Sequence, residues 1–134
     1  LYGAWLCGTC LGAVGMAPHH KLCHVLGGTF DLPHAETHTI VLPHALAYNA
    51  PAIPDVIERL RPVLGGDPAQ ALYDLTARLG TPRALRDIGM PETGIADATQ
   101  RALANPYWNP RPLEAEPIHA LIQRAWTGAP PQAD

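Results

Sequence analysis

Prolines and glycines divide this sequence into segments of helical length, and within several segments apolar residues recur every three or four positions. The clearest case is the last segment, where Leu113, Ile118, Leu121, Ile122 and Trp126 are spaced to form one apolar face. Proline favours the first position of a helix and glycine the position after its end, so these residues mark the boundaries. The predicted helices are Ala4–Met16, Pro18 to the pair Gly27-Gly28, Ala35–Tyr48, Pro54–Leu64, Pro68–Leu79, Pro82–Asp87, Asp97–Ala104 and Glu114–Trp126.

The segment Ala35–Tyr48 is open to an alternative. Its interior, Thr39–Leu42, is apolar and β-branched, which favours a strand, and Pro43 would bend a helix because its nitrogen has no hydrogen to donate. No other segment alternates convincingly between apolar and polar residues, so the predicted fold class is all-α, a multi-helix bundle. Loops are predicted over residues 29–33 and 105–112, with His34 at a loop-to-helix entry and a frayed tail over residues 128–134.

An apolar run from Ala4 to Ala17 lies near the start of the chain. A secretory signal would need a basic region before the run, and no Lys or Arg precedes Lys21. A membrane span would need about 20 apolar residues, and this run is shorter and interrupted by glycines. We therefore predict a buried helix with close neighbours, and no membrane partner. The absence of an initiating methionine suggests a piece of a longer protein.

Composition narrows the classes of function. The chain has 134 residues, 47% of them hydrophobic and 16% charged, which suits one domain with a core. Its formal net charge is -3 with acids and bases interspersed, so nucleic acid is not an expected partner. Cys7-x-x-Cys10 lacks the second ligand pair of a zinc site and does not follow a strand. With Cys23, these residues are predicted to be buried thiols of a cytoplasmic protein.

Histidines carry the most specific chemical signal. Six of the seven lie between His19 and His44, and imidazole both binds metals and titrates near neutral pH. His20 and His24 are four residues apart, so a helix places them on one face as a pair able to hold a metal or a substrate. His44, after Pro43, is predicted to be a capping or core histidine, and His119 to face solvent.

Three long sequence motifs resemble the C-terminal helical domain of the iron-containing alcohol dehydrogenase family, which has a two-domain, dehydroquinate synthase-like fold. They are Gly12–His24, Phe30–His38 and Leu42–Asn49, and the segment 105–112 supports the same resemblance. Within the family they look most like the maleylacetate reductase branch. The resemblance implies that residues 1–128 form most of the helical domain, truncated at its N-terminal side, and residues 129–134 a flexible tail. The N-terminal nucleotide-binding domain is absent, and no G-x-G-x-x-G turn occurs here.

The resemblance also implies a set of site residues. His20 and His34 match the third and fourth ligands of the family's iron or zinc ion, and the first two ligands would lie upstream of Leu1. His24 matches a histidine beside the metal and the nicotinamide of NADH or NADPH, with a proton-relay or substrate-orienting role. The motif Ala35-Glu36-Thr37-His38 stands where the alcohol dehydrogenases have Gly-Val-Ala-Asn, and in this it is similar to the maleylacetate reductases.

The implied reaction is reduction of the carbon–carbon double bond of maleylacetate to give 3-oxoadipate, in bacterial degradation of aromatic compounds. Hydride addition to a conjugated alkene leaves enolate charge on the carbonyl oxygen, which the site must stabilise before it supplies a proton. The hypothesis assigns the first task to His20 and His34, directly or through a metal, and the proton to His24 or His38. Lys21 is the candidate partner of a substrate carboxylate. On a helix at most one of His19 and Lys21 can share the pocket of His20.

Three interpretations stay open at this stage. The chain is part of a maleylacetate reductase, part of a metal-dependent alcohol dehydrogenase, or a non-catalytic helical interaction module. The first two predict an exposed apolar face where a missing domain docks, whereas the module predicts none. The segment alone is expected to be inactive, and the full-length enzyme to be a homodimer.

Overall fold

The computed structural model describes residues 1–104 and 107–133, and every regular element within them is helical. The elements are α1 (Tyr2–Ala13), α2 (Pro18–Phe30), α3 (His34–Asn49), η1 (Ala50–Ala52), α4 (Pro54–Leu64), α5 (Pro68–Leu79), η2 (Leu85–Ile88), α6 (Gly94–Ala104) and α7 (Ala115–Thr127). The predicted all-α class is therefore confirmed. Asn105 and Pro106 of the predicted loop lie outside the described residues, and residues 107–112 are neither helix nor strand.

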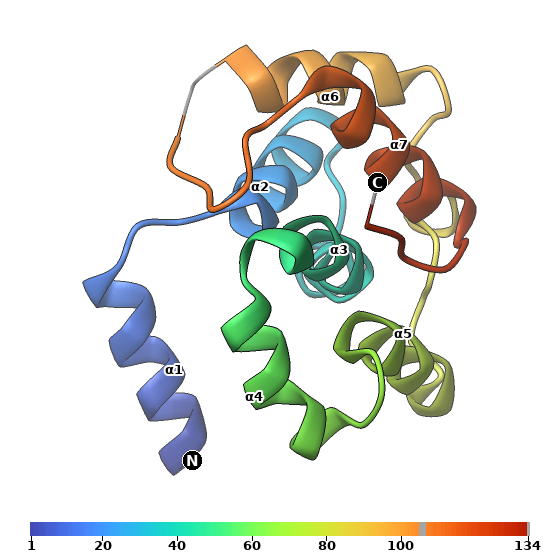
Figure 1. Cartoon of the computed structure of the whole chain (residues 1–134). Helices are drawn as coiled ribbons and strands as arrows, with labels where there is room; N and C mark the ends of the chain where they lie inside the picture. The colour runs from blue at the N-terminus through green and yellow to red at the C-terminus, as the bar shows by residue number, and fades with distance from the viewer. Residues whose placement is uncertain (105–106, 134) are drawn as a thin grey trace.

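Helix α3 lies at the centre of the bundle and packs against α2, α5 and α7 (Figure 1). Ile40, Val41, Ala45 and Tyr48 on this helix are all buried in the core. The strand alternative for Thr39–Leu42 is thus wrong. Because helices surround α3 on several sides, its apolar residues need no single face, and local β propensity gives way to tertiary packing.

Helix α2 runs through the pair that was predicted to end it. Neither Gly27 nor Gly28 adopts a positive φ, and the left-handed residue at the end of the helix is Asp31, with φ 53°. Aspartate tolerates this conformation better than most residues. The helix continues because Leu26 is buried and Phe30 packs against the core. The turn from residue 31 to 33 then places His34 at the start of α3, as predicted.

Other boundaries follow the sequence more closely. Helices α4 and α5 have the predicted bounds, and the Asp67 side chain accepts a hydrogen bond from the Ala69 N–H at 2.9 Å. The helix predicted over Pro82–Asp87 is wrong, since Ala84 is extended and only Leu85–Ile88 forms a 3-10 helix. Helix α6 begins at Gly94, where an added Cβ would lie 2.6 Å from Cζ of the Phe30 ring. The missing side chain at Gly94 therefore lets α6 approach α2.

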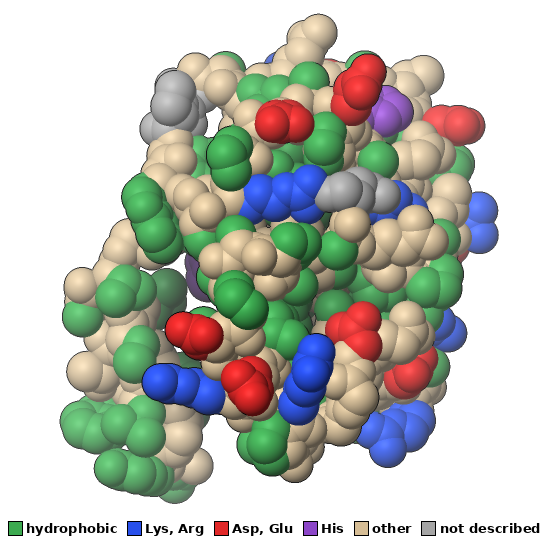
Figure 2. Space-filling view, viewed as in Figure 1, with side chains coloured by type: hydrophobic (Ala, Val, Ile, Leu, Met, Phe, Trp, Pro, Cys, Tyr) green, Lys and Arg blue, Asp and Glu red, His purple; other side chains and the backbone are tan. Residues whose placement is uncertain are grey.

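Helix α1 differs most from expectation. It was predicted to be buried, yet every residue in it is exposed and it packs against no other described element. Figure 2 shows it standing off from the body of the molecule, without acidic or basic side chains on the visible face. Apolar and small residues occur all around α1, so it has no polar face. The prediction of burial is wrong because no described element of this chain covers the helix. None of the helices in residues 1–104 and 107–133 is long and apolar enough to cross a membrane.

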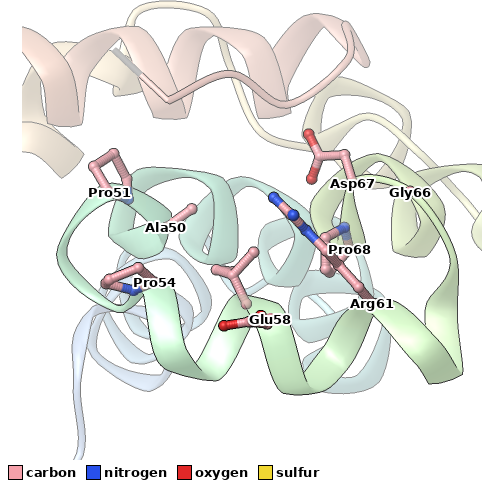
Figure 3. A pocket seen from close by; sticks show the side chains of 9 residues that line it. Ala50, Pro51, Pro54, Glu58, Arg61, Gly66, Asp67 and Pro68 are labelled. Atoms are coloured by element: carbon pink, nitrogen blue, oxygen red, sulfur yellow. The ribbon is translucent and has the colours of Figure 1, made fainter.

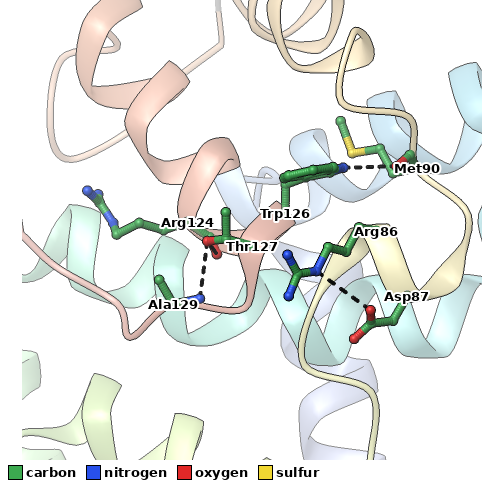
Figure 4. A network of polar contacts seen from close by, with 7 residues as sticks. All are labelled: Arg86, Asp87, Met90, Arg124, Trp126, Thr127 and Ala129. Atoms are coloured by element: carbon green, nitrogen blue, oxygen red, sulfur yellow. Dashed lines mark hydrogen bonds and ion pairs between the residues drawn. The ribbon is translucent and has the colours of Figure 1, made fainter.

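The end of α7 is held by several polar contacts (Figure 4). The Trp126 indole N–H donates to the Met90 carbonyl at 2.9 Å, and the Ala129 N–H donates to the Arg124 carbonyl at 3.0 Å. The Tyr73 hydroxyl donates to the Gly128 carbonyl. The fraying predicted from residue 128 is therefore wrong for Gly128 and Ala129, because both are tied to α5 or α7.

The cysteine prediction holds for one residue of three. Cys23 is buried in the core, whereas Cys7 and Cys10 lie on α1 and are exposed, and all three are free thiols. Burial raises the pKa of Cys23 to about 12. At about pH 8 we expect iodoacetamide to modify Cys7 and Cys10 well before Cys23, because the thiolate is the nucleophile. Peptide mass spectrometry over time measures this, and equal rates at Cys7 and Cys23 would contradict it.

Candidate functional site

The packing of α2 against α3 brings five histidines together, and we call them the histidine cluster. His20 and His24 lie one turn apart on α2 with ring centroids 6.1 Å apart. His34 and His38 are also four residues apart, on α3, and their ring centroids lie 4.3 Å apart. Across the two helices His38 lies 4.9 Å from His20 and 4.9 Å from His19, and His24 lies 6.4 Å from His34. The four histidines predicted for the site are thus contiguous.

His19 is a fifth member that the sequence left undecided. Its Nε2 hydrogen donates to the His38 carbonyl oxygen, with 3.1 Å between the nitrogen and the oxygen. Of the two residues that flank His20 on α2, His19 therefore faces the cluster and Lys21 does not. This confirms that only one of them can share the surroundings of His20.

The cluster has a closed end and an open end. His19, His20 and His38 are partly buried, whereas His24 and His34 are exposed. Burial lowers the pKa of His38 to about 4, with a further lowering from its four histidine neighbours. Burial likewise lowers the pKa of His19. Both imidazoles are therefore mostly neutral near pH 7. Because His24 and His34 are the exposed members, a substrate would reach the cluster from their side.

Lys21 lies beside the cluster in a pocket of its own. Its Nζ is 5.4 Å from the centroid of the Tyr107 ring. The cavity, of about 220 Å³, is lined by Lys21, His24, Val25, Arg101, Ala102 and Tyr107. His24 belongs both to this pocket and to the histidine cluster, so it joins the two.

Arg101 is a positive residue of this pocket that the sequence did not reveal. Its Nε donates to both carboxylate oxygens of Asp97, at 2.9 and 2.8 Å. Burial raises the pKa of Tyr107 to about 12, so this phenol stays neutral. Only the packing of α6 against α2 brings Arg101 opposite Lys21, and no motif connects residues this far apart in sequence.

Metal binding was predicted for His20 and His34. Within the described part of the chain, one nitrogen each of His19, His20 and His38 lies within 4.8 Å of the others, so these three side chains could converge on an ion. Nε2 of His38 is buried and has no hydrogen-bond partner among these residues. His34 contacts His38 and His24, and its role as a ligand stays a prediction.

A wider groove of about 860 Å³ lies on another part of the surface, between η1, α4 and the start of α5 (Figure 3). Prolines form much of its lining, with Glu58, Arg61 and Asp67 as its charged residues. None of the predicted site residues lines it, so it adds nothing to the chemistry of the cluster.

The two remaining histidines lie where they were predicted. His44 is a core residue with 1% of its surface exposed, and neither ring nitrogen has a hydrogen-bond partner in the described residues. Burial and the positive charge of Arg124 lower the pKa of His44 to about 4. His119 is exposed on α7.

Comparison with known protein families assigns this all-helical domain to one of them. Residues 1–126 match the profile of the Fe-containing alcohol dehydrogenase family, C-terminal part. The chain belongs to this family.

Its relatives include maleylacetate reductases. One from Sphingobium indicum is 58% identical over 98% of this chain and 38% of its own length. The crystal structure of maleylacetate reductase from Rhizobium sp. strain MTP-10005 is 54% identical with a TM-score of 0.92, covering 98% of this chain and 37% of that one. An iron-containing alcohol dehydrogenase from Corynebacterium glutamicum is 41% identical with a TM-score of 0.75, covering 84% and 32%. The chain thus spans little more than a third of the length of these relatives.

Proposed function

We propose that this chain forms part of a maleylacetate reductase that uses NADH or NADPH. The observation that carries the proposal is the 54–58% identity to maleylacetate reductases along almost the whole chain. A putative alcohol dehydrogenase from Ralstonia eutropha JMP134 is 63% identical over 98% of the chain, so the test below compares both classes of substrate. Membership of this family argues against the non-catalytic module, as does the exposed apolar helix α1.

The proposed reaction adds hydride to the alkene carbon β to the ketone of maleylacetate. The electron pair of the double bond moves onto the ketone oxygen as an enolate, and the α carbon then takes a proton to give 3-oxoadipate. Stabilising the enolate oxygen lowers the barrier most, because charge develops there. His20 and His34 are proposed to face this oxygen, while the exposed His24 supplies the proton.

Exposure and pKa favour His24 over His38 as the proton donor. With its pKa near 4, His38 is almost entirely neutral at pH 7, so it suits an N–H hydrogen-bond donor better than an acid. His24 lies at the open end, where it can exchange protons with solvent. We therefore place His24 in the proton-transfer role, and His38 in a positioning role through its ring contacts with His20 and His34.

The carboxylates of the substrate need positive partners. The pocket of Lys21 and Arg101 adjoins the cluster through His24, and its cavity of about 220 Å³ is large enough for one carboxylate end. In a chimera that joins this chain to the rest of a maleylacetate reductase, Lys21→Met is expected to raise KM for maleylacetate about tenfold. The value of kcat should change little, because the contact between Lys21 and the carboxylate is the same in ground and transition states. Steady-state kinetics measure the two constants, and an unchanged KM would contradict the role of Lys21.

The family implies a nicotinamide cofactor and a metal. The nucleotide would be held mainly by a part of the protein outside this chain, because no glycine-rich phosphate turn occurs in these 134 residues. Iron or zinc suits imidazole ligands, and His20 lies beside His38, whose buried Nε2 has no hydrogen-bond partner among the described residues. His20 and His34 would hold the ion with ligands from outside this chain. When bound, the ion would polarise the ketone.

The test uses a chimera in which this chain replaces the matching segment of the Rhizobium maleylacetate reductase. NADH oxidation is measured with maleylacetate and with a simple aldehyde, each with and without chelator. Turnover of maleylacetate in preference to the aldehyde is expected. Chelator-sensitive turnover of the aldehyde alone would contradict the proposal and favour an alcohol dehydrogenase.

A further inference from the structure

We propose that Tyr107 is a positioning residue for substrate binding, whose ring face holds the ammonium group of Lys21 where it meets a carboxylate of the substrate. This inference rests on the function proposed above and adds a residue to it. Nζ of Lys21 lies 5.4 Å from the centroid of the Tyr107 ring, within the range of a cation–π contact. Both side chains line the cavity of about 220 Å³ that adjoins the histidine cluster through His24.

Lys21 carries the positive charge that is available to a ligand of this pocket. It is the only lysine in the sequence. Arg101, the other positive residue of the pocket, is already bound to both carboxylate oxygens of Asp97, at 2.9 and 2.8 Å. Among the described residues no acidic side chain forms an ion pair with Lys21. A substrate carboxylate is therefore attracted chiefly to Lys21.

The ring face of Tyr107, and not its hydroxyl group, makes the contact with Lys21. The hydroxyl oxygen is buried and has no hydrogen-bond partner in the part of the chain that the structure describes, so a molecule in the cavity does not reach it. Burial raises the pKa of Tyr107 to about 12, so no phenolate charge attracts the lysine at neutral pH. The negative potential of the aromatic face is what attracts the ammonium group.

The segment that carries Tyr107 is fixed to the C-terminal end of α3. The side-chain amides of Asn49 and Asn109 donate hydrogen bonds to each other, at 3.0 and 2.8 Å. Nη1 of Arg111 donates to the Tyr48 carbonyl at 2.9 Å. Asn49 is only 9% exposed, so water competes little for its hydrogen bonds. The ring two residues before Asn109 thus has a fixed place from which it holds Lys21.

Holding Lys21 matters for binding because a lysine side chain is flexible. Its four-carbon stem samples many rotamers in water, and a ligand that fixes the ammonium group removes this freedom at a cost in affinity. A ring that already restrains Lys21 lowers that cost. The effect belongs to substrate binding and not to the chemical step, so it changes KM and leaves kcat nearly unchanged.

The kinetic test uses the chimera of this chain with the Rhizobium maleylacetate reductase. Tyr107→Leu removes the ring face and is expected to raise KM for maleylacetate about fivefold, with kcat nearly unchanged. Tyr107→Phe keeps the ring face and should restore the lower KM. Trp108→Leu is the matched control, because it removes an aromatic side chain that is 76% exposed at the next position, and it should leave both constants unchanged. In a Lys21→Met background, Tyr107→Leu should raise KM no further.

A second readout measures the contact itself, without turnover. Reductive methylation with isotope-labelled formaldehyde labels Lys21 and the N-terminal amine of this chain, and Lys21→Arg identifies the lysine signal by NMR. Protons above an aromatic ring resonate upfield. The Lys21 methyl signal should therefore lie upfield of that of free dimethyllysine in the unmodified chain and in Tyr107→Phe, and it should move to the free position in Tyr107→Leu. Circular dichroism checks that each variant is folded.

Two kinetic results would overturn the proposal. One is a rise in KM in Tyr107→Phe as large as that in Tyr107→Leu, which would assign the effect to the hydroxyl group. The other is an undiminished effect of Tyr107→Leu in the Lys21→Met background. An unchanged Lys21 methyl signal in Tyr107→Leu would overturn it as well. A chimera that does not reduce maleylacetate contradicts the proposed function instead, and the methyl signal then still decides whether Tyr107 holds Lys21.

Discussion

His24→Ala in the chimera is expected to lower kcat for maleylacetate by about 10²- to 10⁴-fold, the usual contribution of a positioned acid or base. The change in KM should be small, because the proton is needed in the transition state rather than for binding. The reason is structural: His24 is exposed at the open end of the cluster, 6.4 Å from the ring of His34, and it also lines the pocket of Lys21.

The matched control is His119→Ala, which removes an exposed histidine from α7, far in sequence from the cluster. It should leave kcat and KM unchanged. Imidazole added to the buffer should restore part of the activity of His24→Ala, because its protonated form can enter the space that the side chain leaves and donate the proton. A variant at His24 with the kinetics of the parent chimera would remove this residue from the mechanism.

The second large effect concerns stability. We expect the free energy of unfolding to fall by about 3 kcal/mol between pH 6.5 and pH 4 through His44 alone. Burial and then Arg124 lower the pKa of His44 from 6.5 to about 4 in the folded chain. Below pH 6.5 the unfolded chain therefore binds a proton that the folded chain refuses, so stability is lost as the pH falls. The loss levels off below pH 4, where both states are protonated.

His44→Leu isolates this contribution. Both ring nitrogens of His44 lack hydrogen-bond partners among the described residues, so leucine removes no hydrogen bond from the core. Urea unfolding at several pH values should show the unmodified chain losing about 3 kcal/mol more than His44→Leu between pH 6.5 and 4. Parallel curves for the two proteins would show that His44 titrates normally.

The parts of the fold that could be predicted are those set by local chemistry. Pro54, Asp67 and Pro68 begin helices where proline and a capping carboxylate favour them, and Gly65 and Gly80 follow the ends. The end of α2 could not be predicted in this way. Gly27 and Gly28 are compatible with a helix, and the packing of Leu26 and Phe30 decides where it ends.

Helix α1 was mispredicted for a related reason. Its apolar and small residues occur on every side, as in an interior helix, but the partner that would cover it is not in this chain. The chain spans about 38% of the length of the maleylacetate reductase from Sphingobium indicum. We propose that the remainder of such a protein covers α1.

For the site, spacing within one helix was informative and spacing between helices was not. His20 and His24, four residues apart, predict a shared face. That the His38 ring lies 4.9 Å from both His19 and His20 depends on the turn at residues 31–33 and on the register of α3 against α2. Arg101 joins the pocket of Lys21 only through tertiary packing.

The most direct test of the proposed function determines which carbon of the product receives the hydride. The chimera is supplied with maleylacetate and NADH that carries deuterium at the transferred position, and the product is examined by NMR and mass spectrometry. The account predicts 3-oxoadipate with deuterium on the former alkene carbon β to the ketone, and with the ketone intact. Deuterium on a carbinol carbon, with the double bond retained, would show carbonyl reduction of the alcohol dehydrogenase kind and contradict the account.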